Sequence, residues 1–239
     1  MKRKIFKVSI IVPFYNMENE VERTAGQLTN YMEKNFEKYE VIFVNDGSLD
    51  KSLAKLQKRI PKKNVKLISL RNNRGKGFAI KKGIKASSGD FILFTDADLP
   101  YDLQAIKYLI GELLLGYDVV LGSRQHPKSK FLVKEKLHRK ILSAVFSRIA
   151  NLVLIEEIID TQCGLKGFSK KSADAIFSKA FLSGFAFDVE VIYLAQKYGY
   201  KIKLIPVKLV HDSKSTVNFK HMFSMLSDVG MLLKRSKFN

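Results

Sequence analysis

Short apolar runs that end in polar or glycine-containing turns mark the first half of this chain. Val8-Ser9-Ile10-Ile11-Val12 is such a run and ends at Pro13, and its β-branched residues are typical of a strand buried in a parallel sheet. Segments expected to be helical separate the runs. The expected strands are 8–12, 40–44, 65–70, 90–95 and 119–122, and the expected helices are 19–36, 51–59, 77–84 and 103–115.

This alternation predicts an α/β fold: a mostly parallel, twisted, Rossmann-like sheet with right-handed crossovers and helices on both faces. Ligands of such sheets bind beyond the carboxyl ends of the strands. Polar residues that fall at those ends are therefore expected to face one crevice. They are Asn16, Asp46, Arg74, Asp96 and Arg124.

The second half of the chain is less regular. Its expected elements are helices over 137–155 and 188–197 and strands over 164–168 and 202–210. Because no linker or internal repeat divides the sequence, we expect one domain, residues 1–212, followed by a basic amphipathic tail, residues 213–239. The tail carries an apolar stripe at helical spacing, which fits either an anionic membrane interface or a cover for the core. The stripe consists of Met222, Met225, Leu226, Val229, Leu232 and Leu233.

Apolar residues make up 46% of the sequence, enough for a large core, and the formal net charge is +19. Such an excess of positive charge indicates an anionic partner: a phosphate-rich ligand, an anionic membrane or a nucleic acid. The basic residues gather in 71–85 and 124–140. The sequence has no RNP-like aromatic motif and no recognition-helix motif, which argues against nucleic acid.

The single cysteine, Cys163, allows no intrachain disulfide and suits a reducing compartment. The basic N-terminus runs straight into the first strand and lacks the apolar stretch of a signal peptide. The sequence has no run of about 20 apolar residues, so we expect no spanning helix. If the protein works at a membrane, these features predict that it is peripheral on the cytoplasmic face, acting alone or with a membrane-protein partner.

Asp96-Ala97-Asp98 directly follows the apolar run Phe91-Ile92-Leu93-Phe94. Two carboxylates one residue apart at a strand end can share a hard divalent cation. A site with a small number of oxygen ligands suits Mg²⁺ or Mn²⁺, and the bound ion then bridges to a phosphate. For an isolated Asp-x-Asp the alternative is a polar turn that closes a buried strand. The other motifs of this chain favour the metal site.

Seven motifs follow one another along the chain. They are Val8-Ser9-Ile10-Ile11-Val12-Pro13-Phe14-Tyr15-Asn16, Val44-Asn45-Asp46-Gly47-Ser48, Arg74-Gly75-Lys76-Gly77, Asp96-Ala97-Asp98, Gly122-Ser123-Arg124, Asp160-Thr161-Gln162-Cys163-Gly164 and Phe187-Asp188-Val189-Glu190. In this order and spacing they resemble the family 2 inverting nucleotide-sugar glycosyltransferases, over residues 8–215. Within that family the chain is most similar to enzymes that load a sugar onto a polyprenyl phosphate, such as the dolichyl-phosphate β-glucosyltransferases. The resemblance implies a GT-A fold.

The resemblance also implies roles for individual residues. Asp96 and Asp98 would hold Mg²⁺ or Mn²⁺, which stabilises the departing nucleoside diphosphate together with Lys76. The expected catalytic residues are Asp98, Lys76 and Asp188, the last as a base or as a charge at a helix N-terminus. The expected donor-binding residues are Pro13, Tyr15, Asn16, Glu18, Asp46, Ser48, Arg74, Lys76, Asp96, Ala97, Asp98, Gln162 and Lys214. The sequence departs from the family at Met17, where Glu is usual, and at Pro100, where Gln is frequent.

The acceptor decides whether a base is needed. A sugar hydroxyl must lose its proton to a nearby carboxylate, whereas a phosphate monoester is already anionic at pH 7. A phosphate acceptor needs a cationic seat instead, for which Arg124, Arg139 and Ser143 are the candidates.

The expected reaction is therefore the inverting, metal-dependent transfer of a hexose from a nucleotide sugar, UDP-glucose first and GDP-mannose second, to a polyprenyl or dolichyl phosphate. Transfer to the sugar hydroxyl of a lipid or polysaccharide is the close alternative. Two proteins of other classes, a nucleic-acid-binding protein and a non-catalytic nucleotide-sugar sensor, fit the motifs less well.

Overall fold

The computed structural model describes residues 5–60, 63–133, 158, 160–184, 186–211 and 227–235. The strands are β1 (Lys7–Phe14), β2 (Lys38–Asn45), β3 (Val65–Ser69), β4 (Phe91–Phe94), β5 (Val119–Ser123), β6 (Lys130–Phe131), β7 (Lys166–Ser169), β8 (Ile202–Pro206) and β9 (Lys208–Leu209). The helices are α1 (Val21–Asn35), α2 (Ser52–Arg59), α3 (Lys76–Lys85), α4 (Gln104–Leu114), α6 (Lys170–Lys179) and α7 (Phe187–Lys197). Residues 227–235 are also helical.

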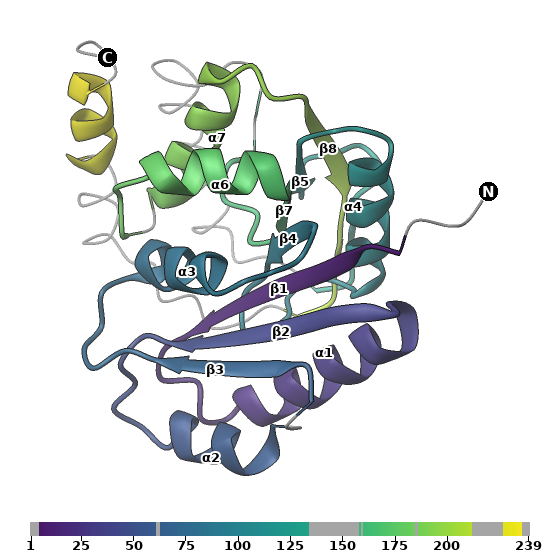
Figure 1. The fold of residues 1–239 in the computed structure, drawn as a ribbon, viewed down its shortest axis with the longest axis vertical. Coiled ribbons are helices and arrows are strands. Elements are labelled where there is room, and N and C mark those ends of the chain that lie inside the picture. The colour runs from purple at the N-terminus through teal and green to yellow at the C-terminus, as the bar shows by residue number, and fades with distance from the viewer. Residues whose placement is uncertain are drawn as a thin grey trace.

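Seven strands form one twisted sheet in the order β3-β2-β1-β4-β7-β5-β8 (Figure 1). All neighbours pair in parallel except β7, which runs antiparallel to β4 and β5. In the register, Ile10 of β1 lies opposite Val41 of β2 and Leu93 of β4. The mostly parallel sheet is as predicted, and the carboxyl ends of β1 to β4 lie at one edge.

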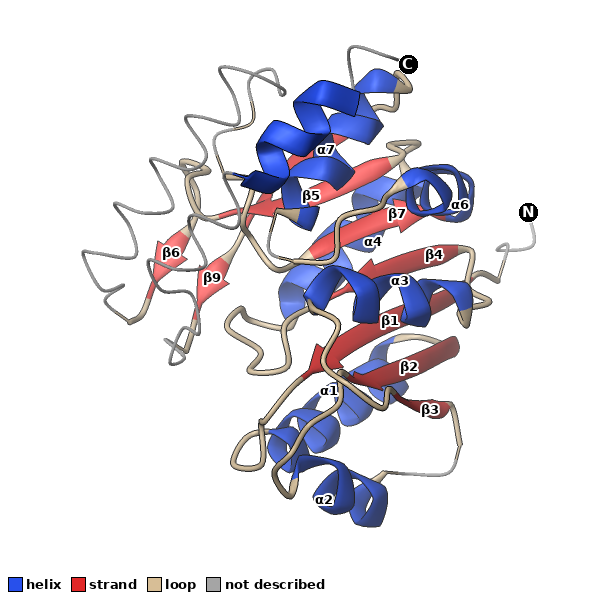
Figure 2. Cartoon of the chain, turned by 90° about the vertical axis from the view of Figure 1, so that its left-hand side faces the viewer, coloured by secondary structure: helices blue, strands red, loops and turns tan. Residues whose placement is uncertain are grey.

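Helices cover both faces of the sheet, with α1, α2 and α4 on one side and α3, α6 and α7 on the other (Figures 1 and 2). Alternate residues of β1 point to the two sides. Val8, Ile10 and Val12 join the core on the side of α1 and α4, whereas Ile11 joins the core on the side of α3 and α7. Strand β1 is thus buried on both faces, which explains its continuous apolar sequence.

The strands and helices expected in the first half are present, with ends that differ by two residues or fewer. Two differences from the prediction concern the second half. The strand expected over 202–210 is divided into β8 and β9, and β9 pairs with β6 in a separate two-stranded sheet. Helix α6 was not predicted. The helix expected over 137–155 lies outside the described residues.

The described part of the C-terminal stripe packs against protein. Val229 and Leu232 are each 3% exposed and belong to the core on the side of α3 and α7. These two side chains therefore cover the core, which is one of the two alternatives expected for the stripe. In the described part of the chain, no helix is both long and apolar enough to cross a bilayer.

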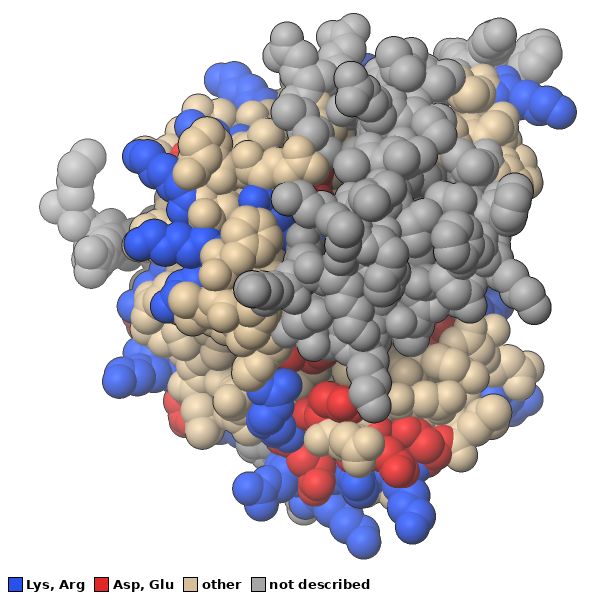
Figure 3. Space-filling model, turned by 180° about the vertical axis from the view of Figure 1, so that it is seen from behind, with Lys and Arg blue, Asp and Glu red and all other residues tan. Residues whose placement is uncertain are grey.

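Seen from behind, Asp and Glu side chains gather in one area of the surface, with Lys and Arg side chains around them (Figure 3).

Candidate active site

The loop between β3 and α3 is held by the carboxylate of Asp46, which follows β2. Asp46 Oδ1 accepts a hydrogen bond from Arg74 N at 2.9 Å, and Oδ2 accepts one from Gly75 N at 2.8 Å. Gly75 has a φ of 94°, and a Cβ there would lie 2.4 Å from the Ser183 carbonyl oxygen, so glycine is required. Burial raises the pKa of Asp46, although the two N–H donors oppose the shift. The loop therefore enters α3 along one path, with Lys76 as the first helical residue.

Side-chain hydrogen bonds join the loops that follow β1 and β2. Asn16 N donates to Ser48 Oγ at 3.0 Å, and Asn16 Oδ1 accepts from Leu49 N at 2.9 Å. Glu18 Oε2 accepts from Lys51 N at 3.1 Å. The structure thereby brings two loops with predicted donor-binding residues to the carboxyl edge of the sheet. These residues are Tyr15, Asn16 and Glu18 in one loop and Asp46 and Ser48 in the other, and Pro13 lies in β1 just before the first loop.

The Asp96-Ala97-Asp98 turn follows β4, and α1 holds its backbone. The Thr24 hydroxyl donates to the Ala97 carbonyl oxygen, and Arg23 Nη2 donates to the Asp98 carbonyl oxygen at 3.1 Å. Arg23 Nη1 also lies 3.0 Å from His211 Nε2. Two consecutive carbonyl groups are thus fixed, which limits the positions open to the carboxylates of this turn.

Four charged side chains form an alternating line beside this turn. Lys76 Nζ lies 2.8 Å from Asp96 Oδ1 and 3.7 Å from Asp188 Oδ2, and Lys166 Nζ lies 2.6 Å from Asp188 Oδ1. Burial alone would lower the pKa of Lys76, but the carboxylates of Asp188 and Asp96 outweigh it and raise that pKa. Burial would raise the pKa of Asp96, but Lys76 outweighs it and the pKa is lowered. Lys76 and Asp96 are therefore both charged at neutral pH.

Lys166 was not predicted as a site residue. Its side chain is 0% exposed, and Nζ also donates to the Cys163 carbonyl oxygen at 2.7 Å. The ammonium lies 5.6 Å from the centre of the Phe94 ring. A lysine inside an otherwise apolar expected strand was the available signal, because a buried lysine requires a carboxylate partner.

Arg124 is paired with the carboxylate of Asp160, a pairing that was also not predicted. Its Nη2 donates to Asp160 Oδ1 at 2.7 Å, and its Nε and backbone N donate to Oδ2 at 3.0 and 2.7 Å. Burial would raise the pKa of Asp160, but the Arg124 hydrogen bonds outweigh it and the pKa is lowered. Arg124, proposed as a phosphate ligand, is thus already paired with a carboxylate, and its side chain is 15% exposed.

Glu190 holds the segment that faces the glycine loop. Its two carboxylate oxygens accept hydrogen bonds from Phe181 N at 2.8 Å and Leu182 N at 2.9 Å. The next residue, Ser183, accepts a hydrogen bond from Gly77 N at 2.8 Å. Burial raises the pKa of Glu190 despite these donors. Glu190 therefore acts on the backbone that supports Lys76.

Of the remaining predicted residues, Gln162 has a buried Nε2 with no hydrogen-bond partner among the described residues. Arg139, Ser143 and Lys214 lie outside those residues. Within the described part of the chain, no group of three or more His, Cys, Asp or Glu side chains could hold a metal ion.

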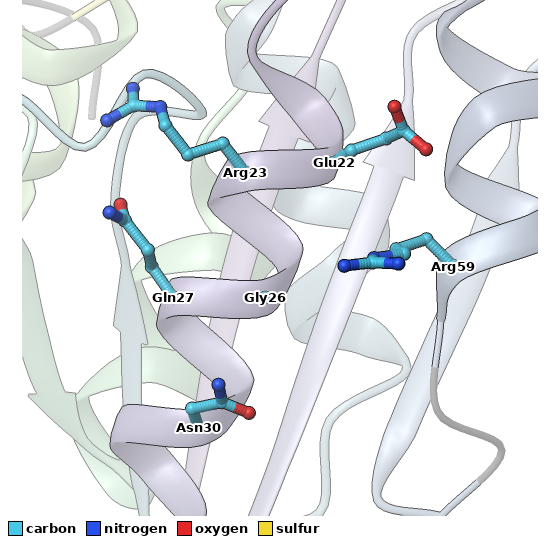
Figure 4. Close-up of a pocket in the computed structure, with 6 residues that line it drawn as sticks. All are labelled: Glu22, Arg23, Gly26, Gln27, Asn30 and Arg59. Carbon is cyan, nitrogen blue, oxygen red and sulfur yellow. The ribbon is translucent and has the colours of Figure 1, made fainter.

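A groove of about 540 Å³ lies away from these carboxylates, along the outer side of α1. Arg23 and Gln27 extend to one side of the helix, and Glu22 faces Arg59 of α2 on the other (Figure 4). Its link to the site is Arg23, which also holds the Asp98 carbonyl.

Comparison with known proteins gives results consistent with this geometry. The model of the glycosyl transferase family 2 matches residues 9–177. The chain is 33% identical to a dolichyl-phosphate beta-glucosyltransferase of Dictyostelium discoideum, over 93% of this chain and 72% of that protein. It is also 33% identical to the enzyme of that name from Homo sapiens, over 84% of this chain and 66% of that protein. The chain thus spans 66% to 72% of the length of these relatives.

The fold is similar to solved structures of low sequence identity. Glucosyl-3-phosphoglycerate synthase from Mycobacterium tuberculosis, in complex with Mn²⁺, UDP and glucosyl-3-phosphoglycerate, matches with a TM-score of 0.73 at 14% identity. The match covers 96% of this chain and 80% of that one. The expected GT-A fold is confirmed by this likeness and by the strand order described above.

Proposed function

We propose a function from one premise: the chain belongs to glycosyl transferase family 2. The protein transfers glucose from UDP-glucose to dolichyl phosphate or another polyprenyl phosphate, with inversion at the anomeric carbon. The similarity to two dolichyl-phosphate beta-glucosyltransferases supports this choice of donor and acceptor. The reaction takes place on the cytoplasmic face of a membrane, where the protein is peripheral or bound to a membrane-protein partner.

The observation that supports a phosphate acceptor is that the carboxylates of the site are already paired with cations or backbone N–H groups. Asp188 lies between two lysines, and Asp96 holds Lys76. Asp160 holds Arg124, and Glu190 accepts two backbone N–H groups. The lowered pKa values of Asp96 and Asp160, each caused by its cationic partner, make these two carboxylates poor acceptors for the proton of a sugar hydroxyl. A phosphate monoester needs no such acceptor because it is already ionised.

The residues present fit a divalent cation. Asp96 and Asp98 offer oxygen ligands from one turn, and Asp96 is kept ionised by Lys76. Mg²⁺ and Mn²⁺ accept one or two protein carboxylates when substrate phosphates and water complete the shell, so a group of three protein ligands is not needed. The bound ion would act as a Lewis acid on the departing diphosphate.

The other roles belong to this chain's own groups. Lys76 adds positive charge beside the diphosphate. The loop of Arg74 and Gly75, whose backbone N–H groups are held by Asp46, positions Lys76 at the start of α3. The nucleoside is held by Pro13 near the end of β1, by the loop of Tyr15, Asn16 and Glu18, and by the loop of Asp46 and Ser48. Gln162 and Lys214 bind the donor. Arg124, Arg139 and Ser143 hold the acceptor phosphate and align it with the anomeric carbon.

A product assay tests the proposal. The purified protein is incubated with radiolabelled UDP-glucose, Mn²⁺ and dolichyl phosphate, and the lipid extract is treated with mild acid. We expect an acid-labile glucosyl phosphate lipid, and no product when dolichol replaces dolichyl phosphate. Transfer of mannose from GDP-mannose, with no transfer from UDP-glucose, would refute UDP-glucose as the donor. An acid-stable glycoside as product would refute a phosphate acceptor.

Replacing Gly164 with alanine should impair this activity without unfolding the protein. A Cβ at Gly164 would lie 1.8 Å from Asp96 Oδ2, so the carboxylate must move. Because the Asp96 carboxylate can turn away, the free energy of unfolding should fall by only about 1 kcal/mol. Displacing a metal ligand should lower the transfer rate by about a hundredfold. Gly111→Ala in α4 is the control, since nothing lies within 4 Å of its Cβ; equal rates for the two variants would contradict the prediction.

A further inference from the structure

Lys76 has two acidic neighbours that differ in what else they hold. Its Nζ lies 2.8 Å from Asp96 Oδ1, and 3.7 Å from Asp188 Oδ2. The other oxygen of Asp188 is taken by Lys166 at 2.6 Å. Asp96 is thus paired with one ammonium group, and Asp188 with one close and one more distant.

The two carboxylates also differ in exposure. The side chain of Asp96 is 32% exposed, whereas that of Asp188 is 2% exposed. A cation from solvent therefore reaches Asp96 and not Asp188. Since Lys76 already neutralises Asp96, an arriving divalent cation meets an ammonium group at the carboxylate it requires.

We propose that Lys76 is a resident cation of Asp96, which a divalent ion must displace before it binds that carboxylate. The displaced ammonium moves toward Asp188 Oδ2 and becomes available to the diphosphate of the donor. This inference rests on the proposed function in one respect, the assignment of Asp96 as a metal ligand. It adds a competition between two cations that the assignment alone does not contain.

The competition predicts that metal and nucleotide bind together. Without nucleotide, the metal gains Asp96 but forces Lys76 from its nearest carboxylate. With a nucleotide diphosphate present, the phosphates attract both the metal and the released ammonium. The nucleotide-free protein should therefore bind Mn²⁺ weakly, and UDP should strengthen that binding.

Replacing Lys76 with methionine should change Mn²⁺ binding in opposite directions in the two states. Mn²⁺ affinity is measured by electron paramagnetic resonance of free Mn²⁺, without nucleotide and with saturating UDP. Without UDP the K76M variant should bind Mn²⁺ about tenfold more tightly, because a nearby positive charge is gone. With UDP it should bind Mn²⁺ about tenfold more weakly, because the diphosphate has lost an ammonium partner.

Two further variants separate charge from packing. K76R keeps the positive charge and should retain the wild-type order of affinities in both states. K81M removes another lysine of α3, whose Nζ donates to the Ala180 carbonyl oxygen at 3.2 Å, and should leave Mn²⁺ affinity unchanged. A circular dichroism spectrum and a thermal melt of each variant confirm that it is folded.

An unchanged or weaker nucleotide-free Mn²⁺ affinity in K76M would overturn the proposal, and so would the absence of Mn²⁺ binding in all variants. A matching gain in K81M would also overturn it, because the effect would then be general charge removal. These measurements need no turnover. A protein that shows the predicted reversal but makes no glucosyl phosphate lipid would refute the proposed acceptor and leave this inference standing.

Discussion

Replacing Asp98 with asparagine or alanine is expected to lower the rate of glucose transfer by about a thousandfold or more. The proposed reaction places growing negative charge on the diphosphate, and Asp98 is one of two carboxylates proposed to hold the cation that neutralises it. Asparagine keeps the size of the side chain but removes its charge. Transfer is measured with UDP-glucose and dolichyl phosphate, and Mn²⁺ binding with UDP present should weaken in parallel.

A carboxylate elsewhere on the surface provides the control for Asp98. Asp174 of α6 is 57% exposed and pairs with Lys170 at 2.7 Å, one helical turn away. Asp174→Asn removes the same charge and should leave the transfer rate unchanged. Full activity of Asp98→Asn in the presence of Mn²⁺ would reject the metal role of this turn, and an equal loss in Asp174→Asn would reject its specificity.

The strands of the first half could be predicted because their signal is local. The apolar run of β1 and the run of β4 each carry burial on both faces within a few residues, and polar turns mark their ends. The motifs at those ends could be assigned to one edge, since the carboxyl ends of parallel strands meet there. The Asp96-Ala97-Asp98 turn was found in this way.

The second half carried weaker local signals. In α6 only Ser172, Ala173 and Ile176 are buried, so the apolar pattern covers little more than one turn. Its start was signalled only by Ser169, whose hydroxyl caps the helix by accepting a hydrogen bond from Ser172 N. The antiparallel direction of β7 depends on pairing with both β4 and β5, which are distant in sequence.

The sequence patterns did not predict which charged residues of the site pair with one another. Arg124 was assigned to a phosphate, yet it pairs with Asp160, which lies 36 positions away. Asp188 was proposed as a base, yet a lysine from β7 and a lysine from α3 approach its two oxygens. A sequence shows which residues can carry charge, but their pairing is decided by the crossing of elements in the folded sheet. For this site, that pairing is what bears on the choice of acceptor.

Replacing Lys166 with methionine is expected to lower the free energy of unfolding by about 3–5 kcal/mol, because it leaves the buried carboxylate of Asp188 without its nearest cation. Methionine fills a similar volume, so the loss reports charge and hydrogen bonding more than packing. Unfolding in urea, followed by circular dichroism, measures the change. Lys170→Met is the control. The Lys170 side chain is 44% exposed and forms an ion pair with Asp174 at 2.7 Å, so its loss should lower the free energy of unfolding by about 1 kcal/mol or less. Adding Asp188→Asn to Lys166→Met should recover part of the loss, since no buried charge then remains unpaired. Equal stability of the Lys166→Met and Lys170→Met variants would show that the buried pair contributes no more than a surface pair.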